Sequence, residues 1–287
     1  MNSALLHNGK VVTAAEYNPD VHGNRIYCID KSCKAPVIYV AGTESSVPYF
    51  KTTGKNEESK HTEKCGFYKP LTFEESILKV KEYQAELLEQ GIKETVIRLN
   101  LNRIDPDYEA KQVEREESEK KTKDPNEIKV KQENATPNSI GSLKAIVKLM
   151  TSYEPDILAS ILISVKGKKI PISEIVISHD KAHELLWADQ AIDSLSYFVY
   201  GTIEQVFRRE KVYYINFNPV RNVLFSLVVF DKYFKHFTYT DEQLIGKNIL
   251  AWGGLRKNTF QEKNTSEMII KSNKYIEFLP NSKNKEM

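Results

Sequence analysis

The stretch YCIDKSCKAPVIYVAGTESSVPYFKTTGKNEESKHTEKCGFY, residues 27–68, contains all the cysteines of the chain, Cys28, Cys33 and Cys65. His61 lies four residues before the last of them. Each close pair, Cys28 with Cys33 and His61 with Cys65, can direct its side chains toward one ion. Zn(II) prefers four nitrogen or sulfur ligands in a tetrahedron, and three Cys with one His fill that shell. The spacing therefore predicts a structural zinc site.

Other interpretations of the three thiols stay open. An odd number of cysteines argues against a disulfide framework, but it is compatible with separate buried or surface thiols, or with one reactive thiol. His22 offers another nitrogen near the first pair, and we expect it to be a surface residue rather than a ligand.

Two short strands are expected between the cysteine pairs. The segments APVIYVAG (35–42) and VPYFKTTG (47–54) combine β-branched and aromatic residues, and each ends at a glycine. Residues 1–68 hold few large apolar side chains, so metal binding would supply the missing free energy of folding. We therefore expect a small zinc-ribbon domain at 1–68.

The N-terminal segments follow one another in the order ALLHNGKVVTAAEY, Cys, Cys, APVIYV, PYF, His, Cys. This order resembles the zinc-ribbon domain of CoiA-like competence proteins and of plasmid and phage proteins. The resemblance covers residues 1–68 and implies the same four zinc ligands. This chain differs from that pattern in its first Cys pair, which is spaced by four residues instead of two, and in lacking a middle His after PYF. The resemblance further implies a nuclease-type domain downstream, which needs separate support.

Composition predicts a protein that folds in water. The chain has 287 residues, 40% of them hydrophobic, and a mean hydropathy of -0.47. No apolar run approaches the roughly 20 residues of a membrane-spanning helix, and the N-terminus lacks a secretory pattern. We therefore expect a cytoplasmic protein without a membrane partner. The net charge of +2 is too small to indicate a nucleic-acid partner by itself.

The middle of the chain combines helical segments with a charged run. Thr72 and Glu75 form a capping-box pattern before a periodic apolar helix that ends at Gly91. A strand is expected in KETVIRLNL, so 69–104 is predicted as helix and strand. Residues 105–138 mix both charge signs with almost no apolar residues, which predicts a flexible linker. Residues 139–194 are predicted to form a helical and hairpin region, with a turn at Lys166 and Gly167 and a helix after Ser178.

Four polar residues in that last helix raise the question of a second metal site: His179, Asp180, His183 and Glu184. The two His are four residues apart, but the H-E-x-x-H order is absent. We interpret them as the polar first turn of a core helix.

Residues 195–280 predict a five-stranded β-barrel. Strands are expected at 197–207, 212–217, 223–230, 248–256 and 266–270, with a further strand at 275–279. Three strands, a connector and two more strands is the element order of an OB-fold. Val199, Gly201 and Ile203, and the segment LIGKNILAWGGLRKN, resemble OB-fold nucleic-acid-binding domains. The complete expectation is an α+β protein with a zinc ribbon, a helical and charged linker and an OB-like barrel.

Charge and exposed aromatics indicate a nucleic-acid surface on this domain. Residues 195–279 contain 12 Lys or Arg and 8 Asp or Glu, a net charge of +4. If Val199 and Ile203 face the barrel interior, strand alternation turns Phe198 and Tyr200 outward, and Tyr214 outward from the second strand. Packing against the preceding helix is the alternative for these aromatics. The predicted nucleic-acid contacts are Tyr200, Arg208, Arg209, Lys211, Tyr214, Arg221, Arg256 and Lys257.

Three function classes remain. The first is a non-enzymatic protein that binds single-stranded nucleic acid, with a zinc ribbon or linker that can also contact a protein partner. The second is a protein-binding adaptor or inhibitor from a phage or mobile element. The third, a metal-dependent nuclease, is disfavoured because no Asp with a following Glu-x-Lys is evident.

Overall fold

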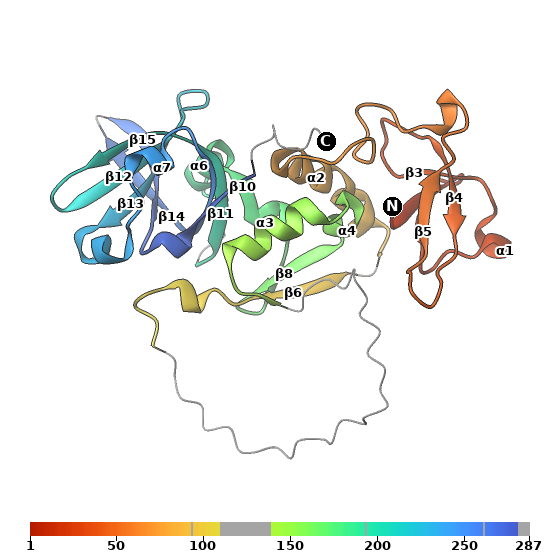
Figure 1. Ribbon diagram of the computed structural model, residues 1–287, viewed down its shortest axis with the longest axis horizontal. Helices are drawn as coiled ribbons and strands as arrows, with labels where there is room; N and C mark the ends of the chain where they lie inside the picture. The colour runs from red at the N-terminus through yellow and green to blue at the C-terminus, as the bar shows by residue number, and fades with distance from the viewer. Residues whose placement is uncertain (93, 110–138, 193, 261, 281–287) are drawn as a thin grey trace, which may run out of the picture.

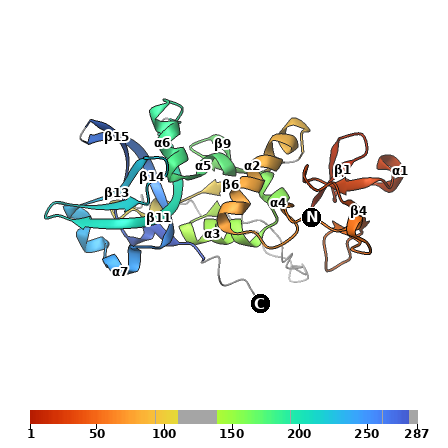
Figure 2. The same ribbon diagram turned by 90° about the horizontal axis from the view of Figure 1, so that it is seen from above.

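The computed structural model describes residues 1–92, 94–109, 139–192, 194–260 and 262–280. It is a mixed α+β fold with three β-sheets. Both views place the sheets in a row along the longest axis, with the N-terminal sheet at one end and the C-terminal sheet at the other (Figures 1 and 2). None of the described helices is both long enough and apolar enough to cross a bilayer.

The N-terminal sheet is antiparallel throughout. Its strands are ordered β2 (Val11–Thr13), β1 (Ser3–Leu6), β3 (Ile26–Cys28), β4 (Pro36–Val40) and β5 (Tyr49–Thr52). The loops contain α1 (Pro19–His22) and the 3-10 turn η1 (Glu57–Ser59). The two strands expected between the cysteine pairs are thus present as β4 and β5. Their inward side chains, Val37 and Phe50, are buried.

Helix α2 (Phe73–Glu89) connects this sheet to the middle of the molecule. The predicted capping box is confirmed, because Thr72 Oγ1 accepts from the N–H of Glu75 at 3.2 Å and Glu75 Oε2 accepts from the N–H of Thr72 at 2.8 Å. The helix packs against α3 (Leu143–Ser152), α4 (Pro155–Ala159) and α5 (Ile172–Ile175). Gly91, the predicted stop, has a φ of 68° that favours glycine.

The middle sheet has four strands, in the order β7 (Ser139–Ile140), β6 (Thr95–Leu99), β8 (Ile161–Val165) and β9 (Lys168–Pro171). β6 runs parallel to both its neighbours, whereas β8 and β9 form the predicted hairpin. The middle region also holds the N-terminal strand, since Asp156 Oδ2 accepts from the N–H groups of Asn2 and Ser3 at 2.6 and 2.8 Å.

The C-terminal sheet closes into a ring of five strands. Each strand pairs with the next in the order β11 (Ser196–Arg208), β12 (Val212–Phe217), β13 (Leu224–Phe230), β15 (Lys263–Ile269) and β14 (Asn248–Phe260), and β14 pairs with β11. All these pairs are antiparallel except β13 with β15. β10 (Val176–Ser178) and β16 (Ile276–Phe278) extend the sheet beyond the ring.

Strand β11 bends to close the ring. Its first half, 196–202, pairs with β14, and its second half pairs with β12 after an irregularity between Ile203 and Gln205. Such a bulge bends a strand and increases its twist. The ring interior is filled by buried apolar side chains, among them Ile203, Ile215, Phe225, Leu227 and Met268.

Short helices surround the ring. Helix α6 (His179–Trp187) contacts β11, β13, β14 and β15, while the 3-10 turn η3 (Asp231–His236) and α7 (Asp241–Leu244) connect β13 to β14. The turn η2 (Asn102–Ile104) follows β6, and η4 (Asn273–Tyr275) precedes β16.

The predicted linker at 105–138 is described only at its start. Lys271 Nζ forms ion pairs with Asp105 at 2.7 Å and with Asp107 at 3.1 Å, and Tyr233 donates its hydroxyl to Asp107 at 2.5 Å. Residues 105–109 are therefore attached to the ring. The rest of the linker prediction, 110–138, lies outside the described residues.

Candidate functional site

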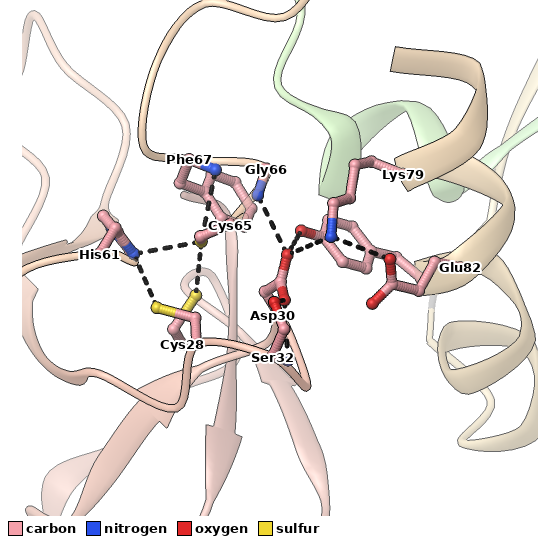
Figure 3. A network of polar contacts seen from close by, with 11 residues as sticks. Cys28, Asp30, Ser32, His61, Cys65, Gly66, Phe67, Lys79 and Glu82 are labelled. Carbon is pink, nitrogen blue, oxygen red and sulfur yellow. Dashed lines mark hydrogen bonds and ion pairs between the residues drawn. The ribbon is translucent and has the colours of Figure 1, made fainter. Parts of the chain in front are cut away.

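Four predicted metal ligands converge beside the N-terminal sheet. Cys28 ends β3, Cys33 follows in the next loop, and His61 and Cys65 come from the segment after η1. Their ligand atoms all lie within 4.8 Å of one another (Figure 3). Among the residues that the structure describes, this is the one group of three or more Cys, His, Asp or Glu residues so arranged. The predicted convergence is confirmed.

The separations between these atoms fit a tetrahedral zinc shell. Cys28 Sγ lies 3.6 Å from Cys65 Sγ, and His61 Nδ1 lies 3.4 Å from the sulfurs of both Cys33 and Cys65. Tetrahedral Zn–S bonds of about 2.3 Å and Zn–N bonds of about 2.0 Å would separate two sulfurs by about 3.8 Å and a sulfur from a nitrogen by about 3.5 Å. The cluster can therefore accept a metal ion through three sulfurs and Nδ1 of His61.

The sulfurs of Cys28 and Cys65 share a hydrogen bond. This bond lowers the pKa of Cys65 against the opposing effect of burial, and the bond with His61 lowers it further. The same bond, together with burial, raises the pKa of Cys28. One sulfur of the pair is therefore readily deprotonated, and the thiolate is the form that binds a metal ion.

Asp30, between the two cysteines of the first pair, joins the cluster to helix α2. Its Oδ2 accepts from the N–H of Gly66 at 3.0 Å, from the hydroxyl of Tyr83 at 2.7 Å and from Nζ of Lys79 at 2.8 Å (Figure 3). Burial favours the protonated acid, but these hydrogen bonds and those of Ser32 outweigh it and hold the pKa of Asp30 below its ordinary value. One carboxylate thus connects both ligand loops to the helix.

Phe67 provides a second contact between the cluster and the helix. Its N–H donates to Cys65 Sγ at 3.4 Å, and its ring stacks on Tyr83 with centroids 5.8 Å apart and planes inclined by 6°. Hydrogen bonds to a ligating sulfur and packing around a metal site orient the ligands. No sequence pattern indicated these contacts, because Lys79 and Tyr83 are ordinary residues of an amphipathic helix.

The spare histidine lies apart from the cluster. His22 stacks on Tyr17 at 5.7 Å, and its Nδ1 accepts from the N–H of Asn18 at 3.0 Å. It is not a member of the group of converging ligands.

The histidines of α6 serve packing. His179 is buried and stacks on Phe217 with centroids 5.1 Å apart, and His183 Nδ1 lies 2.9 Å from the hydroxyl of Ser266. Neither belongs to a metal-ligand cluster among the described residues.

The predicted exposure of Phe198 and Tyr200 is wrong. Phe198 is completely buried and Tyr200 is 9% exposed, with its ring edge-to-face against Phe73 of α2. The first half of β11 is covered on both faces, by the ring interior on one side and by the helices on the other. Strand alternation assigns a residue to a face but does not tell which face meets solvent.

Three of the predicted basic residues have acidic partners, among them Arg256, whose Nε lies 4.0 Å from Oε2 of Glu267. Arg208 donates from Nε to Asp241 at 2.7 Å and lies 4.6 Å from the ring centre of Tyr213. Lys257 pairs with Asp189 at 2.5 Å and lies over the ring of Trp187 at the end of α6. Both side chains are therefore already engaged in contacts within the protein. The other basic residues predicted for this surface are exposed: Arg209, Lys211, Arg221 and Arg256.

The outer face of the ring carries a row of apolar side chains that we name the aromatic row. Strand register aligns its members across four strands, and paired residues lie on the same face of a sheet. Phe207 is 45% exposed, and Tyr214 beside it is half-buried. The guanidinium of Arg209 lies 5.9 Å from the ring centre of Tyr214. The row consists of Phe207, Tyr214, Val228 and Ile269.

Phe207 is the residue of this face that sequence reasoning missed. Uninterrupted alternation from Val199 and Ile203 would place Phe207 on the inner face. The irregularity between Ile203 and Gln205 shifts the alternation by one residue and turns Phe207 outward. A bulge has no clear pattern in a single sequence, and this is why the outward position of Phe207 was not predicted.

No protein-family model matches this chain, and no curated protein sequence matches it. The resemblances to CoiA-like and OB-fold proteins therefore stay predictions.

Proposed function

We propose that this protein binds single-stranded nucleic acid on the outer face of the five-stranded ring and carries a structural zinc ion in the Cys3His cluster. The aromatic row carries this proposal. Phe207 and Tyr214 lie side by side on neighbouring strands, exposed or half-buried, with Arg209 next to them. Aromatic faces beside cationic side chains are how single strands are bound without regard to sequence.

The order of strands in the ring supports an OB-like interpretation. OB-folds are five-stranded barrels that bind oligonucleotides on their second and third strands and on the loops after the first and fourth. The corresponding strands here are β12 and β13, of which β12 carries Tyr214, whereas Val228 on β13 is buried. The loop after β11 carries Arg209 and Lys211, both exposed.

The zinc proposal depends on the donor set and its separations. Three sulfurs and one imidazole nitrogen fill a tetrahedral shell and leave no open position, which is typical of structural zinc. The residues Cys28, Cys33, His61 and Cys65 would hold the ion, and Asp30 and Phe67 would orient them. The ion would stabilise the loops that join the N-terminal sheet to α2.

Fluorescence anisotropy with labelled single-stranded DNA, single-stranded RNA and duplex DNA tests the nucleic-acid proposal. Replacing Phe207 and Tyr214 together by Ala should weaken binding of single strands, because stacking contributes about 1–3 kcal/mol per base, roughly five- to 150-fold in Kd. Arg209→Ala should reduce the dependence of Kd on salt. Arg208 is a poor choice for this test, since it pairs with Asp241.

Leu78→Ala is the matched control. Leu78 is 66% exposed on α2, outside the ring, so its removal should leave Kd unchanged. Absence of binding to every oligonucleotide would disprove the proposal and favour the protein-binding adaptor. Cleavage of the labelled strand in the presence of Mg²⁺ would favour the nuclease.

A further inference from the structure

The hairpin of β4 and β5 has one buried face and one exposed face. Val37 and Phe50 point into the core of the N-terminal sheet. The residues next to them along each strand alternate to the opposite side. We name that side the hairpin face, and it consists of Ile38, Val40, Val47, Tyr49 and Lys51.

The middle of the hairpin face is apolar and in contact with solvent. Ile38 is 43% exposed, Tyr49 is 39% exposed and Val47 is 47% exposed. The face continues onto β3, where Tyr27 lies half-buried beside Pro36. Apolar side chains that stay exposed next to one another are typical of a surface that binds another protein.

Opposite charges lie at the two ends of the hairpin face. Lys51 stands beside Ile38 on the neighbouring strand. Glu44 lies at the far end, because the bridge between Thr43 and Ser46 makes it a residue of the turn. Both charged residues are exposed, and neither forms an ion pair with another residue of the described ranges. The five residues of chain from Lys51 to Ser46 separate the two charges by about 17 Å.

The order of these charges is self-complementary. In a dimer with twofold symmetry the same surface of both copies meets, and each contact occurs twice. If two hairpin faces stack with their strands antiparallel, Lys51 of each copy meets Glu44 of the other, and the apolar side chains lie between them. Stacking with the strands parallel would bring Lys51 against Lys51. Charge therefore favours the antiparallel arrangement.

The edges of the same sheet are already occupied. On β5, the N–H of Phe50 donates to the carbonyl of Met1 at 2.9 Å, and the carbonyl of Phe50 accepts from the amino group of Met1 at 3.2 Å. On β2, the side chain of Gln90 accepts from the N–H of Val11 and donates to the carbonyl of Gly9. A second copy would therefore meet the face of this sheet rather than pair with an edge strand.

We propose that a second copy of this chain packs its hairpin face against the first, in a twofold dimer in which Lys51 of each copy pairs with Glu44 of the other. Stacked sheets lie about 10 Å apart, a separation that apolar side chains from both faces fill. The N-terminal sheet lies at the end of the molecule opposite the ring, so both aromatic rows stay accessible in the dimer (Figures 1 and 2). This association goes beyond the proposed function and does not depend on nucleic acid.

Sedimentation equilibrium of the full chain over a range of micromolar concentrations tests the dimer. The mean mass should rise with concentration from the 33.0 kDa of one chain toward twice that value. Lys51→Glu and Glu44→Lys should each raise the Kd of the dimer at least about tenfold, because each variant brings like charges together at two places. The double variant restores opposite charges, so its Kd should return to within about threefold of the wild-type value.

Lys148→Glu is the matched control, because Lys148 is exposed on α3, outside the N-terminal sheet, and its reversal should leave the Kd of the dimer unchanged. The mass of one chain at every concentration would overturn the proposal. A dimer whose Kd neither single reversal changes would also overturn it, since another surface would then be responsible. Recovery of the dimer in the double variant supports the pairing and shows that the single variants had not merely unfolded, whereas failure to recover would overturn the pairing.

Discussion

His179 illustrates how one buried residue determines its neighbours. Its imidazole packs in α6 against the ring, stacked on Phe217. A Cβ atom on Gly201 would lie 2.5 Å from Nδ1 of His179 and 2.9 Å from the ring of Phe217. Gly201 is therefore required by close packing.

Gly201→Ala should destabilise the protein by about 1–3 kcal/mol, the usual effect of overpacking a core. Thermal or denaturant unfolding measures the change. Gly254→Ala is the matched control on β14, since a Cβ there meets no atom within 4 Å. Equal stabilities of the two variants would contradict the packing role of Gly201.

The pH dependence of stability should depend on His179. Burial lowers its pKa, partly opposed by Asp180, so the unfolded chain binds a proton more readily than the folded one. The contribution of His179 to the free energy of unfolding should therefore be complete above about pH 6.5 and decrease as the pH falls below that value. Asp156 has the opposite effect on the free energy of unfolding. Because burial raises its pKa to about 6, its contribution decreases as the pH rises toward that value.

Comparison with His179→Phe isolates the histidine. We expect the difference in free energy of unfolding between the two proteins to change between pH 7 and pH 5, in favour of the variant at the lower pH. A difference independent of pH would show that His179 does not titrate in this range.

At the scale of elements, helix α2 is the support of the cysteine loops. Tyr83 makes two contacts with them, a hydrogen bond to Asp30 and a stack on Phe67. Lys31 adds an ion pair with Glu86 at 2.8 Å, but this pair is exposed and contributes little. The position of the cysteine loops should therefore depend on Tyr83.

Tyr83→Phe separates the two contacts of Tyr83, because it keeps the stack and removes the hydroxyl. The loss of a hydrogen bond to a buried carboxylate should cost about 1.5–3 kcal/mol of stability. It should also speed release of metal to a competing chelator, since Asp30 connects both ligand loops. Tyr68→Phe is the control, as Tyr68 is 52% exposed in the same segment. If both variants release metal at the wild-type rate, Asp30 does not position the loops.

At the scale of the whole molecule, the N-terminal sheet and the ring lie at opposite ends of the row of sheets (Figures 1 and 2). Their contributions should therefore be separable. The N-terminal sheet has a small core. The binding free energy of structural zinc in zinc-finger peptides is about 10–16 kcal/mol, so a bound ion would dominate the stability of this sheet. The ring has its own apolar interior.

Removal of the metal should therefore destabilise only the N-terminal end of the molecule. Elemental analysis of the purified protein should find one zinc per chain, and a strong chelator should unfold the N-terminal sheet while binding of single strands by the ring persists. Cys33→Ser should have the same effect without a chelator. Purified protein free of metal, with stability that a chelator does not change, would refute the zinc proposal.

The sequence predicted those features that depend on local patterns. The spacing of Cys28, Cys33, His61 and Cys65 indicated the cluster, and periodicity with caps indicated α2 and the strands of the ring. These signals lie within a few tens of residues. The face that each strand of the ring turns to solvent was harder to predict, as the errors at Tyr200 and Phe207 show.

The amino-acid sequence by itself determined the converging Cys3His group, the capping of α2 and the number of strands in the ring, because each follows from residue type and spacing. Tertiary structure alone decided that Asp30 joins the loops to α2, that Tyr200 is buried against Phe73, and that Phe207 lies beside Tyr214 on the outer face of the ring. The physical reason is that each of these contacts joins segments distant in the chain, so its energy depends on how whole elements pack.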